Sequence, residues 1–327
     1  MAKLRVRLAV VLSFALSYPA LCQSFVEFPV SYPQRIVSSP DGTLWFTKWP
    51  FGSLGRITIE GALVEDGVGS GVGDLAVAAD GSVWAVLDME LAHLVEPLFA
   101  RFPVPNASSG SRIAVGPDEN IWFTAVRQIG RCTPAGLVTA FSLPADSGSP
   151  VAITAGPDGN LWFTESINQI GRITPTGAID EFSLPDGSDF GGEITKGSDG
   201  AVWFTLPRGR IGRITTAGTV SEFAIPRFPP QVLDGITLGP DGNVWFTEAS
   251  YPVGRDPGPG PFPNRVGRIT PNGAITEFDL PNSLAYPVGI AAGSDGNIWV
   301  AEFMASKIAR ISPLLPCAHC TRNVSFR

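Results

Sequence analysis

The chain has 327 residues, of which 44% are hydrophobic, and it carries a net charge of −7 with a pI near 4.9. This acidic balance argues against a nucleic-acid or anionic-membrane binder, because such proteins normally expose a basic patch. At roughly 150 residues per domain the length suggests two domains, although single all-β propellers and barrels reach the same size.

The N-terminal segment has the features of a secretory signal peptide. Basic residues precede the apolar stretch Leu8–Leu16, and Ala20-Leu21-Cys22 supplies small residues for a cleavage site. The alternatives are a membrane anchor, for which the apolar stretch is short, and a lipid anchor on Cys22, which the preceding Leu21 fits poorly. We therefore expect residues 1–22 to be removed, and the mature protein to be secreted or periplasmic without a membrane span.

A repeated phrase dominates the rest of the chain. Its tryptophan recurs seven times at spacings of 38 to 54 residues, and a period near 40 residues is typical of β-propellers. Only Trp49 lies outside this series. The seven repeated tryptophans are Trp45, Trp84, Trp122, Trp162, Trp203, Trp245 and Trp299.

Each repeat divides into four short strands. In one repeat they are expected at 151–155, 161–164, 170–174 and 179–182, with Asp158-Gly159 forming a tight hairpin turn between the first two. Four strands joined by hairpins make one propeller blade. The sequence therefore predicts an all-β, seven-bladed propeller of four-stranded antiparallel blades.

The two ends of the chain indicate how the ring closes. The last repeat has no fourth strand after Lys307–Ser312, whereas Phe25–Val30 resembles the fourth strands of other repeats. We expect this N-terminal segment to complete the last blade, which would remove the exposed edges that an open array of blades would have. The propeller would then span residues 23–313, followed by a tail at 314–327 in which Cys317 and Cys320 favour a small disulfide over a metal site.

The recurring apolar residues and one recurring arginine are assigned to structure. The tryptophans and the phenylalanines that follow them are expected in the core between blades, and Cys132 replaces a core isoleucine. The arginine recurs in six repeats and is expected to latch neighbouring blades. The second repeat departs from the pattern, with Leu94-Val95 in place of Gly-Arg.

Functional side chains are expected on the top face, where the connections between strands vary most. Carboxylates gathered there would suit Mg²⁺ or Ca²⁺, and a solvated rim with local ion pairs is an equal alternative. The long loop 249–264 is either a lid or a tolerated insertion. The expected metal ligands are Glu302 and Glu248, and the expected ligand-binding residues are Asp234, Glu165, Glu193, Lys48, Arg35 and Arg112.

The phrase Gly156–Glu165, continued by Ile170–Gly177 and Ile179–Pro185, resembles the streptogramin B (virginiamycin B) lyase family of seven-bladed propellers. That resemblance implies Mg²⁺-dependent elimination that opens a cyclic depsipeptide antibiotic. It places the family's base at Val288, one metal-binding glutamate at Tyr286 and a substrate-contacting histidine at Asp234. The family also has a second metal-binding glutamate. It is the one functional position that this sequence matches, with Glu302.

Three interpretations follow. No catalytic residue is assigned. Valine cannot transfer a proton, so the first is a non-catalytic, monomeric propeller that binds a small-molecule or extracellular ligand on its top face. The second is a Mg²⁺-dependent carbon–oxygen lyase or other metal-assisted enzyme that uses top-face carboxylates. The third is a metal-dependent lactonase like related six-bladed propellers, whose Asn and Asp ligands have no counterpart here.

Overall fold

The computed structural model describes residues 24–50, 53–66, 71–95, 98–108, 110–185, 191–225, 232–249 and 264–312. The expected signal peptide, the tail 314–327 with its two cysteines, and most of the long loop at 249–264 lie outside these residues. No helix long and apolar enough to cross a membrane occurs in the part of the chain that is described.

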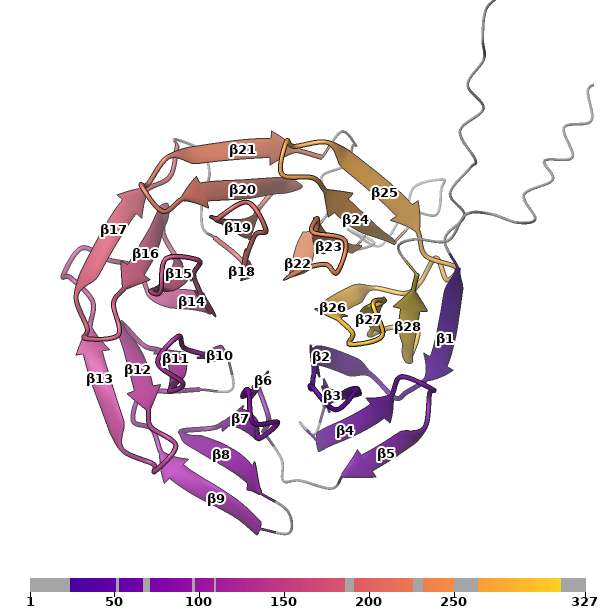
Figure 1. Ribbon diagram of the computed structural model, residues 1–327, viewed down its shortest axis with the longest axis horizontal. Helices are drawn as coiled ribbons and strands as arrows, with labels where there is room; N and C mark the ends of the chain where they lie inside the picture. Colours follow the sequence, from indigo (N-terminus) through magenta and orange to yellow (C-terminus); the bar gives the residue numbers. More distant parts are fainter. Residues whose placement is uncertain are drawn as a thin grey trace, which may run out of the picture.

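Seven four-stranded antiparallel sheets surround a central axis as the blades of a propeller (Figure 1). This arrangement confirms the predicted fold class. The first strand of each blade lies innermost, next to the axis (Figure 1). These inner strands are β2 (Pro33–Ser38), β6 (Asp74–Val77), β10 (Ile113–Val115), β14 (Pro150–Ala155), β18 (Ile194–Lys196), β22 (Val232–Leu238) and β26 (Pro287–Ala292).

The other three strands of each blade follow outward in chain order. The second strands are β3 (Thr43–Lys48), β7 (Val83–Leu87), β11 (Ile121–Ala125), β15 (Leu161–Glu165), β19 (Ala201–Leu206), β23 (Val244–Ala249) and β27 (Ile298–Glu302). The third strands are β4 (Ser53–Thr58), β8 (Glu90–Val95), β12 (Gln128–Cys132), β16 (Gln169–Ile173), β20 (Arg210–Thr215), β24 (Arg265–Ile269) and β28 (Lys307–Ile311). The outer strands are β5 (Leu63–Asp66), β9 (Leu98–Pro103), β13 (Val138–Ser142), β17 (Ile179–Ser183), β21 (Val220–Ala224), β25 (Ile275–Asp279) and β1 (Phe25–Pro29).

The ring is closed by the first strand of the chain. β1 pairs antiparallel with β28, with Phe25 opposite Ile311 and Pro29 opposite Lys307, so it completes the seventh blade as predicted. Phe28 stacks on Trp299 with ring centroids 5.5 Å apart. Glu27 and Lys307 add an ion pair across the same strand pair.

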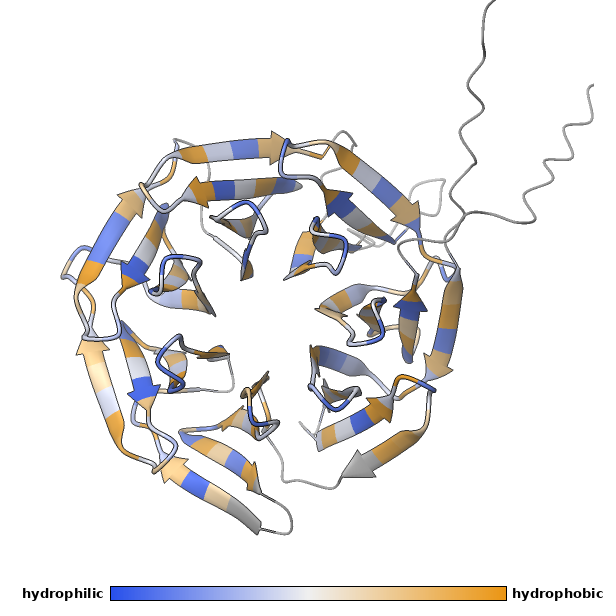
Figure 2. Ribbon diagram, in the orientation of Figure 1, coloured by the Kyte–Doolittle hydropathy of each residue, from blue (hydrophilic) through white to orange (hydrophobic). Residues whose placement is uncertain are grey.

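The core lies between blades, because both faces of each sheet are covered by its neighbours. The second strands are nearly continuous apolar runs, as expected for strands buried on both faces. Trp162, Phe163 and Leu161 are fully buried, and residues of successive blades share the same hydrophobic clusters. Farther out, hydrophobic and hydrophilic bands alternate along the strands (Figure 2). Cys132 lies in one of these clusters, as predicted.

In three blades the recurring arginine is bonded to the next blade, as predicted. Arg131, Arg172 and Arg310 each donate a hydrogen bond of 2.7 to 3.0 Å to a backbone carbonyl in a turn of the following blade. Each guanidinium also lies over the repeated tryptophan of its own blade, 5.5 to 5.7 Å from the ring centroid. This position combines a charge-assisted hydrogen bond with a cation–π contact.

Blade two departs from the pattern, but at other residues than predicted. In the other blades the tryptophan pairs with the arginine across the second and third strands, and in blade two Trp84 pairs with His93. The residues replacing Gly-Arg are therefore Ala92-His93, not Leu94-Val95. Strand register is set by pairing and turn length, which the apolar residues of this irregular repeat do not reveal.

Candidate functional site

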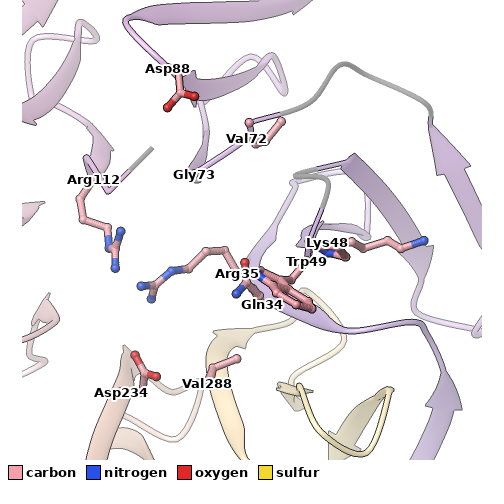
Figure 3. A pocket seen from close by; sticks show the side chains of 12 residues that line it. Gln34, Arg35, Lys48, Trp49, Val72, Gly73, Asp88, Arg112, Asp234 and Val288 are labelled. Carbon is pink, nitrogen blue, oxygen red and sulfur yellow. The ribbon is translucent and has the colours of Figure 1, made fainter. Parts of the chain in front are cut away.

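A pocket of about 450 Å³ opens at the top of the central axis. Figure 3 shows Arg35 and Arg112 reaching toward each other across it, with Asp234 nearby and Trp49 at its wall. Val288, Lys48, Asp88 and Gln34 also belong to its lining. A volume in this range is typical of small-molecule sites.

Side-chain hydroxyls of the second strands fix the starts of the inner strands. The backbone N–H groups of Arg35, Arg112 and Glu193 donate to Oγ1 of Thr47, Thr124 and Thr205 at 2.8 to 3.1 Å. The threonine of the repeated phrase therefore holds the residue that precedes the first-strand isoleucine at a fixed place beside the axis.

Three charged side chains meet at this level to form a charged layer. Arg112 Nε lies 2.7 Å and Arg35 Nη2 lies 3.0 Å from the same oxygen of Glu193, Oε1. The residues come from blades one, three and five, so the layer bridges the axis. A smaller cavity of about 160 Å³, lined largely by inner-strand isoleucines, lies against the same three side chains. The layer thus separates the top pocket from the interior of the channel.

Burial and neighbouring charges act in opposite directions on the acids of the layer. Burial raises the pKa of Glu193, but Arg112 and Arg35 outweigh it, so the net pKa is below its usual range. Burial also dominates at Asp74 and raises its pKa, although Arg112 and Arg35 oppose it. Asp74 Oδ2 accepts a hydrogen bond from the Ile113 amide at 3.2 Å.

Asp234 lines the top pocket beside these arginines. Burial raises its pKa, with Arg35 as the main opposing influence. The group can therefore take up a proton more readily than an ordinary aspartate.

Trp49, which lines the pocket, belongs to a cluster of aromatic side chains. Tyr32, Trp49 and Tyr286 surround Phe303, with ring centroids 5.7, 6.0 and 6.4 Å from it. Trp49 is 52% exposed, whereas each of the seven repeated tryptophans is at most 9% exposed. Trp49 was not among the predicted site residues, and its place outside the repeat is the sequence signal that distinguishes it. We call Tyr32, Trp49, Tyr286 and Phe303 the aromatic rim.

The glutamates at the ends of the second strands lie elsewhere than expected. Glu165, Glu248 and Glu302 are completely buried and do not belong to the lining of either axial cavity. Successive side chains of a strand point to opposite faces, so each glutamate shares the face of the residue two positions earlier, such as Phe163 or Phe246. That face packs against the preceding blade.

The surroundings of Glu302 and Glu165 favour the protonated form. Burial, then the charge of Glu27, raises the pKa of Glu302 to about 7, and Lys307 opposes the shift. Burial and Glu181 raise the pKa of Glu165 to about 7, although its Oε2 accepts a 2.7 Å hydrogen bond from the Gly148 amide. Glu248 lies against Gly267 of the third strand.

The structure thus brings together part of the predicted set. Arg35, Arg112, Glu193 and Asp234 converge at the axis, and Lys48 lies in the pocket lining, whereas Glu165, Glu248 and Glu302 are separated in the seams between blades. Among the described residues, no three His, Cys, Asp or Glu side chains are grouped closely enough to hold a metal ion. The metal-binding role of Glu302 and Glu248 remains a prediction.

Comparison with known proteins points to one family. The model described as "Virginiamycin B lyase family" matches residues 66–256 and 261–314, well over half of the chain. A solved streptogramin B lyase is 34% identical with a TM-score of 0.78, covering 89% of this chain and 97% of its own. Virginiamycin B lyase from Staphylococcus aureus is 32% identical with a TM-score of 0.79, covering 89% of this chain and all of its own.

Two further comparisons complete this picture. A catalytically inactive virginiamycin B lyase from Staphylococcus aureus, with one histidine replaced by alanine, was solved with quinupristin and is also 32% identical, with a TM-score of 0.78 over 89% of this chain and all of its own. No curated protein sequence matches this chain.

Proposed function

Because the chain belongs to the virginiamycin B lyase family, we propose that it binds a small molecule in its top-face pocket without cleaving it. The observation that carries this proposal is the lining of the pocket. Val288 stands where the resemblance implies the base, and Tyr286, where it implies a metal ligand, is part of the aromatic rim.

Elimination requires a base that reaches the abstracted proton and a positive charge that stabilises the enolate-like intermediate. An isopropyl side chain supplies neither a proton acceptor nor a metal ligand. The aromatic rim offers ring faces in place of carboxylate oxygens, which suits binding of apolar, planar groups better than binding of Mg²⁺.

The two sides of the pocket offer complementary contacts to a ligand. Trp49 in the lining and its neighbour Tyr32 present exposed rings for stacking, while Arg35 and Arg112 supply donors and Asp234 an acceptor. The inactive relative with quinupristin supports the idea that this type of propeller holds a ligand when one histidine is missing. A peptide-like ring that carries an aromatic group matches both sides of the pocket.

Trp49 provides a direct readout, since it is much more exposed than the other seven tryptophans. We expect quinupristin, used as the probe, to protect Trp49 from acrylamide quenching of its fluorescence, with no ring-opened product detectable by mass spectrometry. The matched control is Trp49→Phe, which should keep the fold and lose the protected signal. An acrylamide quenching curve that is unchanged at the highest soluble concentration of quinupristin would count against binding of this ligand class.

A second candidate function rests on Asp234. This carboxylate lines the pocket and its pKa is raised by burial, so it is the best-placed proton acceptor for a lyase that works without histidine. Mg²⁺-dependent, chelator-sensitive opening of quinupristin that is lost in Asp234→Asn would establish this function. An increase in melting temperature with Mg²⁺ or Ca²⁺ that is lost in Glu302→Ala would support a metal-assisted enzyme instead.

We also propose that the protein is exported and monomeric. The signal-like segment at 1–22 supports export, and the closed ring, in which each blade packs between two neighbours, supports a monomer. N-terminal sequencing of the secreted protein and light scattering test the two statements. A retained N-terminus or a dimeric mass would contradict them.

A further inference from the structure

The seam between blades two and three contains a cavity of about 370 Å³, away from the top pocket. It is lined by Trp84, His93 and Asp80 of blade two and by Glu119 and Pro134 of blade three, together with Ser82 and small apolar residues. Its position corresponds to the arginine latch of the other seams.

The other blades show what fills this position. In blade four, Arg172 lies over Trp162, approaches Asp158 of its own turn at 3.6 Å and donates to the Thr216 carbonyl of the next blade. In blade three, Arg131 donates in the same way to the carbonyl of Pro175. The equivalent groups of the blade-two seam are Trp84, Asp80 and the Pro134 carbonyl.

The rest of the blade-two seam keeps its regular geometry. Phe102 stacks on Trp84 and packs against Gly136 of the next blade, as Phe141 packs against Gly177 one seam farther on. A Cβ atom on Gly136 would approach Phe102 to 2.2 Å, so the two blades are in close contact. The cavity is therefore the space of a missing guanidinium and not a general separation of the blades.

His93 does not replace the arginine. Its ring stacks flat on Trp84, with centroids 4.1 Å apart, and its Nε2 is buried without a hydrogen-bond partner. The lining of the cavity includes two carboxylates, Asp80 and Glu119, and no lysine or arginine. The site thus has an aromatic floor, an unpartnered buried nitrogen and excess negative charge.

We propose that this cavity, which we call the open latch, binds the guanidinium group of an arginine side chain presented by a peptide or protein partner. The guanidinium would donate to the Pro134 carbonyl and to Asp80, and would lie near Glu119 and the His93–Trp84 stack. A planar cation with several donors fits such a fork of acceptors better than the point charge of a lysine. The proposal does not depend on the function of the top pocket.

The test uses the tripeptide Gly-Arg-Gly as probe, with Gly-Lys-Gly as its matched control. In a His319→Ala background His93 is the remaining histidine of the chain, so its imidazole NMR signals report on the site. We expect Gly-Arg-Gly to shift these signals saturably at millimolar concentration, and Gly-Lys-Gly to bind at least tenfold more weakly. Equal binding of the two peptides, or no shift with either, would overturn the proposal.

Two variants localise the binding, measured by saturation-transfer NMR on the peptide. His93→Arg should close the latch from within and abolish the signal, while Asp80→Asn, at an exposed turn, should weaken it without affecting the fold. The reverse experiment is Arg172→His, which should open a second latch and increase the amount of bound peptide. Free arginine amide as a further probe distinguishes a small-molecule site from a peptide site, since binding of the amide tenfold tighter than the peptide would contradict a protein partner.

Discussion

Two sets of carboxylates in this propeller have opposite electrostatic surroundings. Glu193 lies at the axis between Arg35 and Arg112, and its pKa is lowered. Glu302 and Glu165 lie in the seams between blades, where burial raises the pKa of each to about 7. Burial alone therefore does not determine the charge of an acid here; the number of cations within hydrogen-bond distance does.

The largest effect should follow removal of the charge at the axis. Glu193→Gln leaves Arg35 and Arg112 facing each other without their shared partner, and should lower the free energy of unfolding by about 3 kcal/mol, near the low end for a broken buried ion pair because the side chains are partly exposed. Urea denaturation at pH 7 measures this change.

The control for the axial variant is an exposed ion pair. Glu90 pairs with Arg101 at 3.0 Å, with both side chains more than a third exposed. Glu90→Gln should change the stability by less than about 0.5 kcal/mol. Equal losses from the two variants would show that the axial layer gains nothing from its burial.

A smaller effect of opposite sign is expected at Glu302. Its pKa is raised from 4.5 to about 7, so the folded state holds a proton that the unfolded state releases, and stability falls as pH rises through this window. Glu302→Gln removes this loss and should stabilise the protein by about 2 kcal/mol at pH 8, with little change at pH 4. Thermal unfolding across this pH range tests it, and a stabilisation that does not depend on pH would be inconsistent with titration of Glu302.

A smaller stabilisation than that at Glu302 is expected at Glu165. Its pKa is raised over the same range, but the Gly148 amide donates a hydrogen bond that the charged form accepts most strongly. Glu165→Gln should therefore stabilise the protein at pH 8 by about 1 kcal/mol, less than Glu302→Gln. A stabilisation larger than that of Glu302→Gln would indicate that the Gly148 contact is absent in solution.

The fold was predictable because the same pattern of turns and strands occurs in each of the seven repeats. Asp-Gly turns, apolar second strands and the displaced fourth strand at Phe25–Val30 were sufficient to derive the blades and the closure. Cys132 and the arginine latches also followed from comparison between repeats. The prediction for blade two was wrong because its sequence lacks the Gly-Arg pair of the other repeats.

The site was only partly predictable. Arg35, Arg112 and Glu193 were expected near the mouth, but their sharing of one carboxylate oxygen depends on the width of the ring, which no local pattern contains. The seam glutamates were misplaced although alternation along β15, β23 and β27 contained the necessary information. The aromatic rim combines Tyr32 and Trp49 with Phe303, residues from opposite ends of the sequence that only the closed ring brings together.

The pairing of β1 with β28 also determines how the molecule responds to force. Phe25 and Ile311 lie opposite each other at the end of this strand pair from which both chain ends leave, and just beyond them the Ser312 amide donates to the Ser24 carbonyl at 3.2 Å. Tension applied between the termini therefore acts on one backbone pair at a time, from Ser24–Ser312 toward Pro29–Lys307, as in the opening of a zipper. The contact that closes the ring is consequently the one that yields first under mechanical load, whereas the other blades, each made from one continuous stretch of chain, are loaded only after it has opened.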